Sequence, residues 1–184
     1  DWTLSRGLGD VYKRQHSINL VANGFTEILN ENDEIIISGL EHHSNIVPWQ
    51  MMSKKNGAQI KVIPIKENGE LNLDFYEKIL NKNTKLVFVN HVSNALGTIN
   101  PIAKIIEDAH KVGAAVLIDG AQASAHIKCD LQDLNVDFYV TSAHKLCGPT
   151  GIGMLYGKEK WLNKLPPYQG GCLLYTSPSP RDRV

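Results

Sequence analysis

The stretch KLVFVNHVSNALGTINPIAKIIEDAHKVGAAVLIDGAQ, residues 85–122, decides the fold class of this 184-residue chain. It begins with an apolar run at residues 85–90 and ends with another at 115–119, and both have the length and the branched side chains of buried strands. Between them, residues 102–112 show a helical pattern, with a proline at the start, apolar residues on one stripe and a glycine just beyond the end. Buried strands separated by a helix are typical of an α/β domain.

The same alternation continues outward along the chain. The other predicted strands are EIIIS at 34–38, QIKVIP at 59–64, DFYVT at 137–141 and GIGMLY at 151–156, and the other predicted helices cover residues 45–56 and 74–80. Strands that are apolar on both faces and separated by helices indicate a largely parallel sheet covered by helices.

Composition excludes several classes of protein. The chain has 19 Lys and Arg against 19 Asp and Glu, which gives no reason to expect nucleic acid as a partner. No apolar run approaches the length of a membrane helix. Three cysteines without a CxxC pair predict neither a disulfide framework nor structural zinc. We therefore expect a cytoplasmic protein in a reducing compartment, with neither nucleic acid nor membrane as partner.

Both ends of the chain differ abruptly from the rest and have the character of non-native sequence. CLLYTSPSPRD at residues 172–182 can be encoded by a DNA string whose reverse complement, shifted by one base, encodes SRGLGDVYKR and the start of a Gln codon, which matches residues 5–15. The string resembles the transposon ends used in sequencing libraries. We therefore predict that residues 1–15 and 172–184 are adapter-encoded, and that residues 16–171 are an interior part of a native gene.

Polar side chains gather where the predicted strands end. In open α/β sheets, ligands bind at the carboxyl ends of the strands. Four successive strand ends carry Glu41, His42, His43, Ser44 and Asn45; His91, Ser93 and Asn94; Asp119 and Gln122; and Ser142, His144 and Lys145. Each residue alone is explained by a cap, a turn or a solvated surface, but their placement at one edge of one sheet indicates a site.

The residue types narrow the chemistry of that site. The histidines form neither HExxH nor HxH, so zinc is not expected. A triad of Ser142, His144 and Asp119 would lack the GxSxG elbow. Lys145, Asp119 and a nearby histidine instead suit pyridoxal 5′-phosphate (PLP), which needs a lysine for a covalent bond, a carboxylate for its ring nitrogen and donors for its phosphate.

Four segments carry a resemblance to a known family. GLEHHSNIVPWQ, VNHVSNALGTINPI, VLIDGAQASAH and DFYVTSAHKLCGPTGIGMLYGK resemble, in order and spacing, motifs of the class V aminotransferase superfamily, and among its members the Suf-type cysteine desulfurases, which are close relatives of selenocysteine lyases. The resemblance covers essentially all of residues 16–171. It implies part of the large domain of a fold-type I PLP-dependent transferase, with a mostly parallel sheet, helices on both faces and a homodimer in the intact family.

The resemblance also implies roles for single residues. Lys145 resembles the lysine that bonds covalently to PLP, Asp119 the partner of the ring nitrogen, and His42 the imidazole stacked on the ring. Gln122 resembles the donor to the phenolic oxygen, Asn94 another cofactor contact, and Ser142 and His144 phosphate ligands. Lys145 and His42 are the candidate proton carriers.

The implied reaction converts L-cysteine to L-alanine and leaves the sulfur as a persulfide on an enzyme cysteine, for transfer to an acceptor protein in iron–sulfur cluster assembly. L-selenocysteine is the other candidate substrate. Selenocysteine lyase or another class V enzyme, such as an aminotransferase or a kynureninase, is the alternative, and a non-catalytic fragment is a third.

Departures from the family pattern bear on activity. The family's nucleophilic cysteine lies in a C-terminal part that residues 16–171 do not reach. Cys129 stands where the family usually has an aliphatic residue, and Cys147 where it commonly has Tyr. Arg14 and Gln15 replace a phosphate-binding threonine pair. We therefore expect this chain to be inactive alone.

Overall fold

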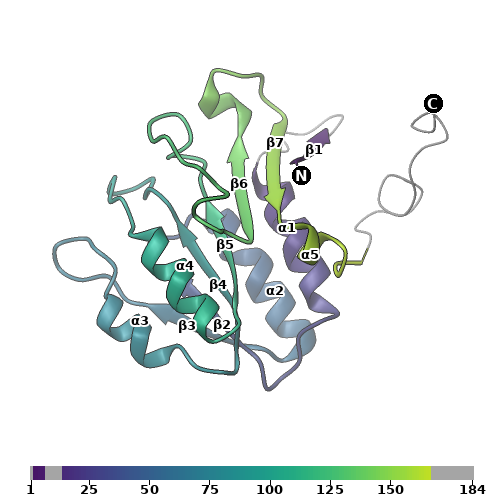
Figure 1. The fold of residues 1–184 in the computed structure, drawn as a ribbon, viewed down its shortest axis with the longest axis vertical. Helices are drawn as coiled ribbons and strands as arrows, with labels where there is room; N and C mark the ends of the chain where they lie inside the picture. The colour runs from purple at the N-terminus through teal and green to yellow at the C-terminus, as the bar shows by residue number, and fades with distance from the viewer. Residues whose placement is uncertain (1, 7–13, 167–184) are drawn as a thin grey trace.

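A computed structural model describes residues 2–6 and 14–166 of the chain, so residues 172–184 and most of the predicted N-terminal adapter segment lie outside the described residues. In the described part, seven strands form one sheet in the order β1-β7-β6-β5-β4-β2-β3 (Figure 1). The strands are β1 (Trp2–Arg6), β2 (Glu34–Ser38), β3 (Gln59–Ile63), β4 (Thr84–Asn90), β5 (Ala115–Asp119), β6 (Phe138–Ser142) and β7 (Ile152–Gly157). Strands β2 to β6 run parallel to one another, and β7 is antiparallel to both β6 and β1. The predicted, largely parallel sheet is thus confirmed.

The helices follow the sequence pattern with two additions. They are α1 (Arg14–Thr26), α2 (Val47–Asn56), α3 (Leu73–Ile79), α4 (Ile102–Lys111) and α5 (Glu159–Leu162), with short 3-10 helices η1 (His43–Asn45) and η2 (Ala143–Leu146). Helices α2, α3 and α4 confirm the three predicted ones within two residues, whereas the sequence pattern does not predict α1 and α5. Helix α4 buries Ile102, Ile105, Ile106 and Ala109, the apolar stripe of its sequence.

Helices cover both faces of the sheet. Along β2, Ile35 and Ile37 belong to one apolar core and Ile36 to the other, as the two-residue period of a strand requires. The first core includes Phe25 of α1 and residues of α2, and the second contains buried residues of α3 and α4, including Tyr76. The expectation of helices on both faces is confirmed.

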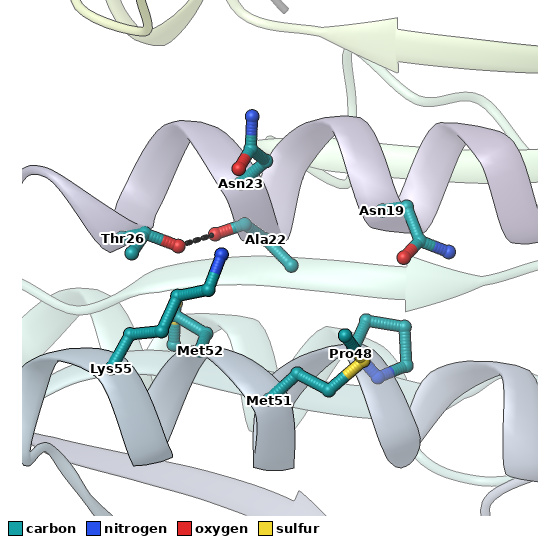
Figure 2. A pocket seen from close by; sticks show the side chains of 8 residues that line it. All are labelled: Asn19, Ala22, Asn23, Thr26, Pro48, Met51, Met52 and Lys55. Atoms are coloured by element: carbon teal, nitrogen blue, oxygen red, sulfur yellow. Dashed lines mark hydrogen bonds between the residues drawn. The ribbon is translucent and has the colours of Figure 1, made fainter.

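Helices α1 and α2 lie next to each other on the first of these faces (Figure 1). Figure 2 shows a pocket of about 70 Å³ between them, lined by Asn19, Ala22, Asn23 and Thr26 of α1 and by Pro48, Met51, Met52 and Lys55 of α2. The Thr26 hydroxyl donates to the Ala22 carbonyl oxygen at 2.9 Å, so it is satisfied within α1. The pocket is far smaller than usual ligand sites, and we assign it to the packing of two helices.

A buried carboxylate ties α4 and α5 to the sheet. Asp137 precedes β6, and its oxygens lie 2.7 Å from His110 Nε2 and 2.8 Å from Trp161 Nε1, which donates to it. The ammonium groups of Lys158 and Lys160 lie 3.4 and 3.1 Å away. Burial alone would raise the pKa of Asp137, but the hydrogen bonds with His110 and Trp161 and the charge of Lys158 hold that pKa below its usual value.

Replacing Asp137 with asparagine is expected to lower the free energy of unfolding by about 2 kcal/mol near neutral pH, because Lys158 and Lys160 lose their counter-ion. A carboxyl whose folded pKa is depressed contributes stability above its ordinary pKa of 3.8 and loses it as the pH falls through the folded value. The advantage of wild type over D137N should therefore shrink in acid. Urea denaturation near neutral pH and in acid measures this difference in stability, and D133N, at an exposed aspartate, is the matched control. Equal stability of D137N and D133N near neutral pH would contradict this account.

In the described part of the chain, no helix combines the length and the apolar character needed to cross a membrane.

Candidate cofactor-binding site

The carboxyl ends of the parallel strands form the site that the sequence indicates. A pocket of about 260 Å³ opens there, lined by Arg14, Gln15, His42, Ser44, Ser142, His144 and Lys145. Its walls come from the start of α1, the segment after β2, the end of β6 and η2. Four of the predicted site residues therefore share one pocket: His42, Ser142, His144 and Lys145.

Asp119 lies at the end of β5 and is engaged by Arg14. Arg14 Nε lies 3.2 Å from Asp119 Oδ2, and Nη1 donates to Oδ1 at 3.4 Å. The backbone N–H of Ala121 also donates to Oδ1, at 3.0 Å. Burial raises the pKa of Asp119, and the charges of Arg14 and Lys145 and the Ala121 N–H oppose that rise. The carboxylate is therefore close enough to Lys145 for their charges to interact.

His42 caps the first turn after β2. Its Nδ1 accepts a hydrogen bond from the Ser44 backbone N–H at 3.1 Å and lies 2.8 Å from Ser44 Oγ. Desolvation and the positive charges of Arg14 and Lys145 lower the pKa of His42. A lowered pKa favours the neutral imidazole, which can accept a proton.

Glu41 holds the segment that carries His42. Its carboxylate accepts hydrogen bonds from Ser38 Oγ at 2.5 Å, from Asn45 Nδ2 at 2.6 Å and from the Asn90 backbone N–H at 2.6 Å. These bonds join the ends of β2 and β4. Desolvation raises the pKa of Glu41 to about 7, despite the donors directed at it.

Three of the seven predicted site residues, Asp119, Gln122 and Asn94, do not line this pocket. Gln122 is half-buried three residues after Asp119, and Asn94 is exposed. Asn94 belongs to a tight turn that Gly97, at a φ of 73°, closes by donating its N–H to the Ser93 carbonyl oxygen at 3.0 Å. Asn94 and Gln122 therefore remain predicted cofactor contacts that lie outside the lining of this pocket.

Arg14 is the contact that residue patterns did not indicate. It opens α1, its backbone N–H donates to Ser142 Oγ at 3.2 Å, and its Nε donates to Ser44 Oγ at 3.3 Å. Its partner Asp119 lies 105 residues away in the sequence. A signal did exist for Ser44 and Glu41, because both follow β2 in the polar cluster that the sequence displays.

Neither of the two described cysteines lines the pocket that contains Lys145. Cys129 is half-buried and lines a different pocket, whereas Cys147 is exposed and follows η2 at a φ of 58°. Burial raises the pKa of the Cys129 thiol. Among residues 14–166, no three His, Cys, Asp or Glu side chains gather in a way that could hold a metal ion.

Comparison with known proteins gives concordant matches. The family described as aminotransferase class-V matches residues 15–184. A cysteine desulfurase of Cronobacter sakazakii is 52% identical over 155 residues, which are 84% of this chain and 38% of that protein. A probable cysteine desulfurase of Mycolicibacterium paratuberculosis is 54% identical over 156 residues, 84% of this chain and 23% of that protein. The chain thus spans well under half the length of these relatives.

Solved structures agree with the sequence matches. The crystal structure of an Escherichia coli cysteine desulfurase superposes with a TM-score of 0.85 at 37% identity, covering 92% of this chain and 41% of that one. The apo structure of a cysteine desulfurase from Thermococcus onnurineus gives a TM-score of 0.83 at 35% identity, covering 91% and 40%. The sheet and its helices therefore have the same arrangement as in those proteins.

Proposed function

The chain belongs to the aminotransferase class-V family, and from that premise we propose that its parent protein is a PLP-dependent cysteine desulfurase that converts L-cysteine to L-alanine. The observation that carries the proposal is the convergence of Lys145, His42 and Asp119 at one edge of a parallel sheet, in a chain about half identical to desulfurases. By the resemblance of its sequence, we further propose a homodimeric cytoplasmic parent that passes sulfur to an acceptor protein for iron–sulfur cluster assembly.

The residues of the pocket match what PLP requires, with one exception. The hydroxyls of Ser44 and Ser142, the imidazole of His144 and the N-terminus of α1 suit a phosphate group. Lys145 supplies the amine for a covalent bond. The exception is Asp119, the carboxylate suited to the ring nitrogen, because Arg14 already pairs with it.

The chain's own groups have separable roles in the proposed chemistry. When bound, PLP links covalently to an amino group and withdraws electrons from the substrate Cα. Lys145 would hold PLP through its amine and would carry a proton at Nζ during the reaction. His42, with its lowered pKa, is suited to accept a proton over the same pocket. Asp119, once released by Arg14, would keep the ring nitrogen protonated.

Sulfur transfer needs a cysteine thiolate, and the two described cysteines do not suit that role. Burial raises the pKa of Cys129, which lowers its thiolate fraction, and Cys129 lines another pocket. Cys147 lies two residues after Lys145 on an exposed turn, at a position where the resembled family commonly has Tyr and not its nucleophilic cysteine. We therefore propose that a cysteine beyond the described residues receives the sulfur in the parent protein.

The position of the covalent bond tests this proposal. Incubating the 184-residue chain with excess PLP, reducing it with borohydride and mapping peptides by mass spectrometry should place the pyridoxyl group on Lys145. K145A is expected to lose this label and the visible absorbance of bound PLP, whereas K78A, at an exposed lysine of α3, should keep both.

A label spread evenly over surface lysines, or one retained in K145A, would overturn the assignment. In the same reactions L-cysteine should yield alanine no faster than with free PLP, since a suitable nucleophile is lacking among the described residues. Faster release of alanine would show that Cys129, Cys147 or an undescribed residue accepts the sulfur.

A further inference from the structure

We infer that Arg14 competes with the cofactor for Asp119, so that PLP binds this chain fully only after the Arg14–Asp119 ion pair opens. The inference rests on the proposed PLP site and assigns a role to a residue that the proposed chemistry does not use. Arg14 lies in the segment predicted to be adapter-encoded, where the resembled family has a threonine. The competition is therefore a property of this chain.

The geometry shows how completely Arg14 engages the carboxylate. Nη1 donates to Asp119 Oδ1 at 3.4 Å, and Nε lies 3.2 Å from Oδ2 while its own N–H donates to Ser44 Oγ. The side chain of Arg14 is 8% exposed and that of Asp119 is 2% exposed, so water screens the pair poorly. Ala121 donates to Oδ1 from its backbone. Asp119 thus already has a buried guanidinium as its counter-ion.

The chemistry makes the two partners of Asp119 competitors for one counter-ion. A protonated pyridine nitrogen and a guanidinium are both cationic N–H donors, and both need this carboxylate as counter-ion. A guanidinium is never deprotonated in proteins, so Arg14 keeps its charge in the pocket. If both occupied the site, two like charges would lie close together with Lys145 nearby, which disfavours protonation of the ring.

Arg14 is also tethered, which makes the competition intramolecular. Its backbone N–H donates to Ser142 Oγ at 3.2 Å and its Nε to Ser44 Oγ at 3.3 Å. As the first residue of α1, it is held at the mouth of the pocket by its own helix. A tethered competitor acts at a fixed, high effective concentration and weakens PLP binding at every PLP concentration.

The alternative to exclude is that Arg14 strengthens PLP binding. An arginine in this pocket could instead bind the phosphate of PLP, and then its removal would weaken binding. The contacts favour competition, since Nη1 donates to Asp119 and Nε lies within ion-pair distance of the same carboxylate. We expect R14A and R14Q to bind PLP about tenfold more tightly than wild type, which corresponds to about 1.4 kcal/mol. R14K, which keeps a positive charge, should gain less PLP affinity than R14A or R14Q.

The affinity is measured by titrating the 184-residue chain and its variants with PLP and following absorbance, with the PLP-dependent shift in Tm as a second readout. Pyridoxal, which lacks the phosphate, serves as the paired probe: competition at Asp119 predicts that R14A binds it more tightly too. In a D119N background, R14A should give no further gain. R14Q keeps more of the side chain than R14A and so guards against an effect of lost packing in R14A.

Equal or weaker PLP binding by both R14A and R14Q would overturn the inference. If both variants bind PLP no better than wild type but Lys145 is still labelled at excess PLP, the competition is wrong and the proposed function stands. If Lys145 is labelled in neither wild type nor the Arg14 variants, the proposed function itself fails.

Discussion

Replacing Trp49 with alanine is expected to lower the free energy of unfolding by about 3–5 kcal/mol. Trp49 lies in α2, is fully buried, and stacks on Phe88 of β4 with ring centroids 3.6 Å apart and planes inclined by 15°. Alanine would remove a large aromatic contact between α2 and the sheet and leave a cavity that the surrounding close-packed residues fill only in part. Urea denaturation followed by far-UV circular dichroism measures the loss.

The same substitution is expected to loosen the segment that carries His42. Trp49 Nε1 donates to Asn45 Oδ1 at 3.0 Å, and Asn45 Nδ2 in turn donates to Glu41 at 2.6 Å. W49F keeps an aromatic ring and removes only the N–H donor, so it should cost about 1 kcal/mol. Comparing the two variants separates packing from hydrogen bonding. If W49A costs no more than W49F, the stacking on Phe88 does not hold α2 on the sheet.

Sequence patterns predict this fold well where apolar periodicity is strong. Residues 102–112 have an apolar stripe and end at a glycine, and α4 matches them within one residue. Helix α1 lacks such a signal, because its buried face includes Ser17, Ala22 and Gly24. Gly24 is buried because the chain approaches closely there: a Cβ at this position would lie 2.8 Å from Leu165 Cδ2. Small and polar residues that are buried because two segments of the chain approach closely do not produce an apolar periodicity in the sequence.

The candidate site is likewise predictable only in part. Strand ends indicate His42, Asp119, Ser142 and Lys145, because topology alone brings them to one edge. The other contacts of the site join residues that are far apart in the sequence, so sequence patterns do not predict them. Glu41 accepts from the backbone of Asn90, 49 residues later, and no local pattern encodes that bond. Such contacts depend on the register of whole strands.

The Arg14–Asp119 pair also joins residues far apart in the sequence. Neutralising only one member of this pair is the second large effect that we expect. D119N should lower the free energy of unfolding by about 3 kcal/mol, because Arg14 then stays buried without a counter-ion and cannot lose its proton. R14Q should cost less, since the buried carboxyl left behind can take up a proton and become neutral.

A double-mutant cycle isolates the pair from other effects of each substitution. Burying two ions costs desolvation energy that their attraction only partly offsets, so removing both charges at once can be nearly neutral. The double variant R14Q/D119N should therefore be more stable than D119N alone, by about 2 kcal/mol in urea denaturation. Additive losses would mean that the two side chains do not interact in solution. Coupling, together with tighter PLP binding in R14Q, would establish that one carboxylate serves as the counter-ion of a guanidinium in the free chain and of the cofactor in the loaded one.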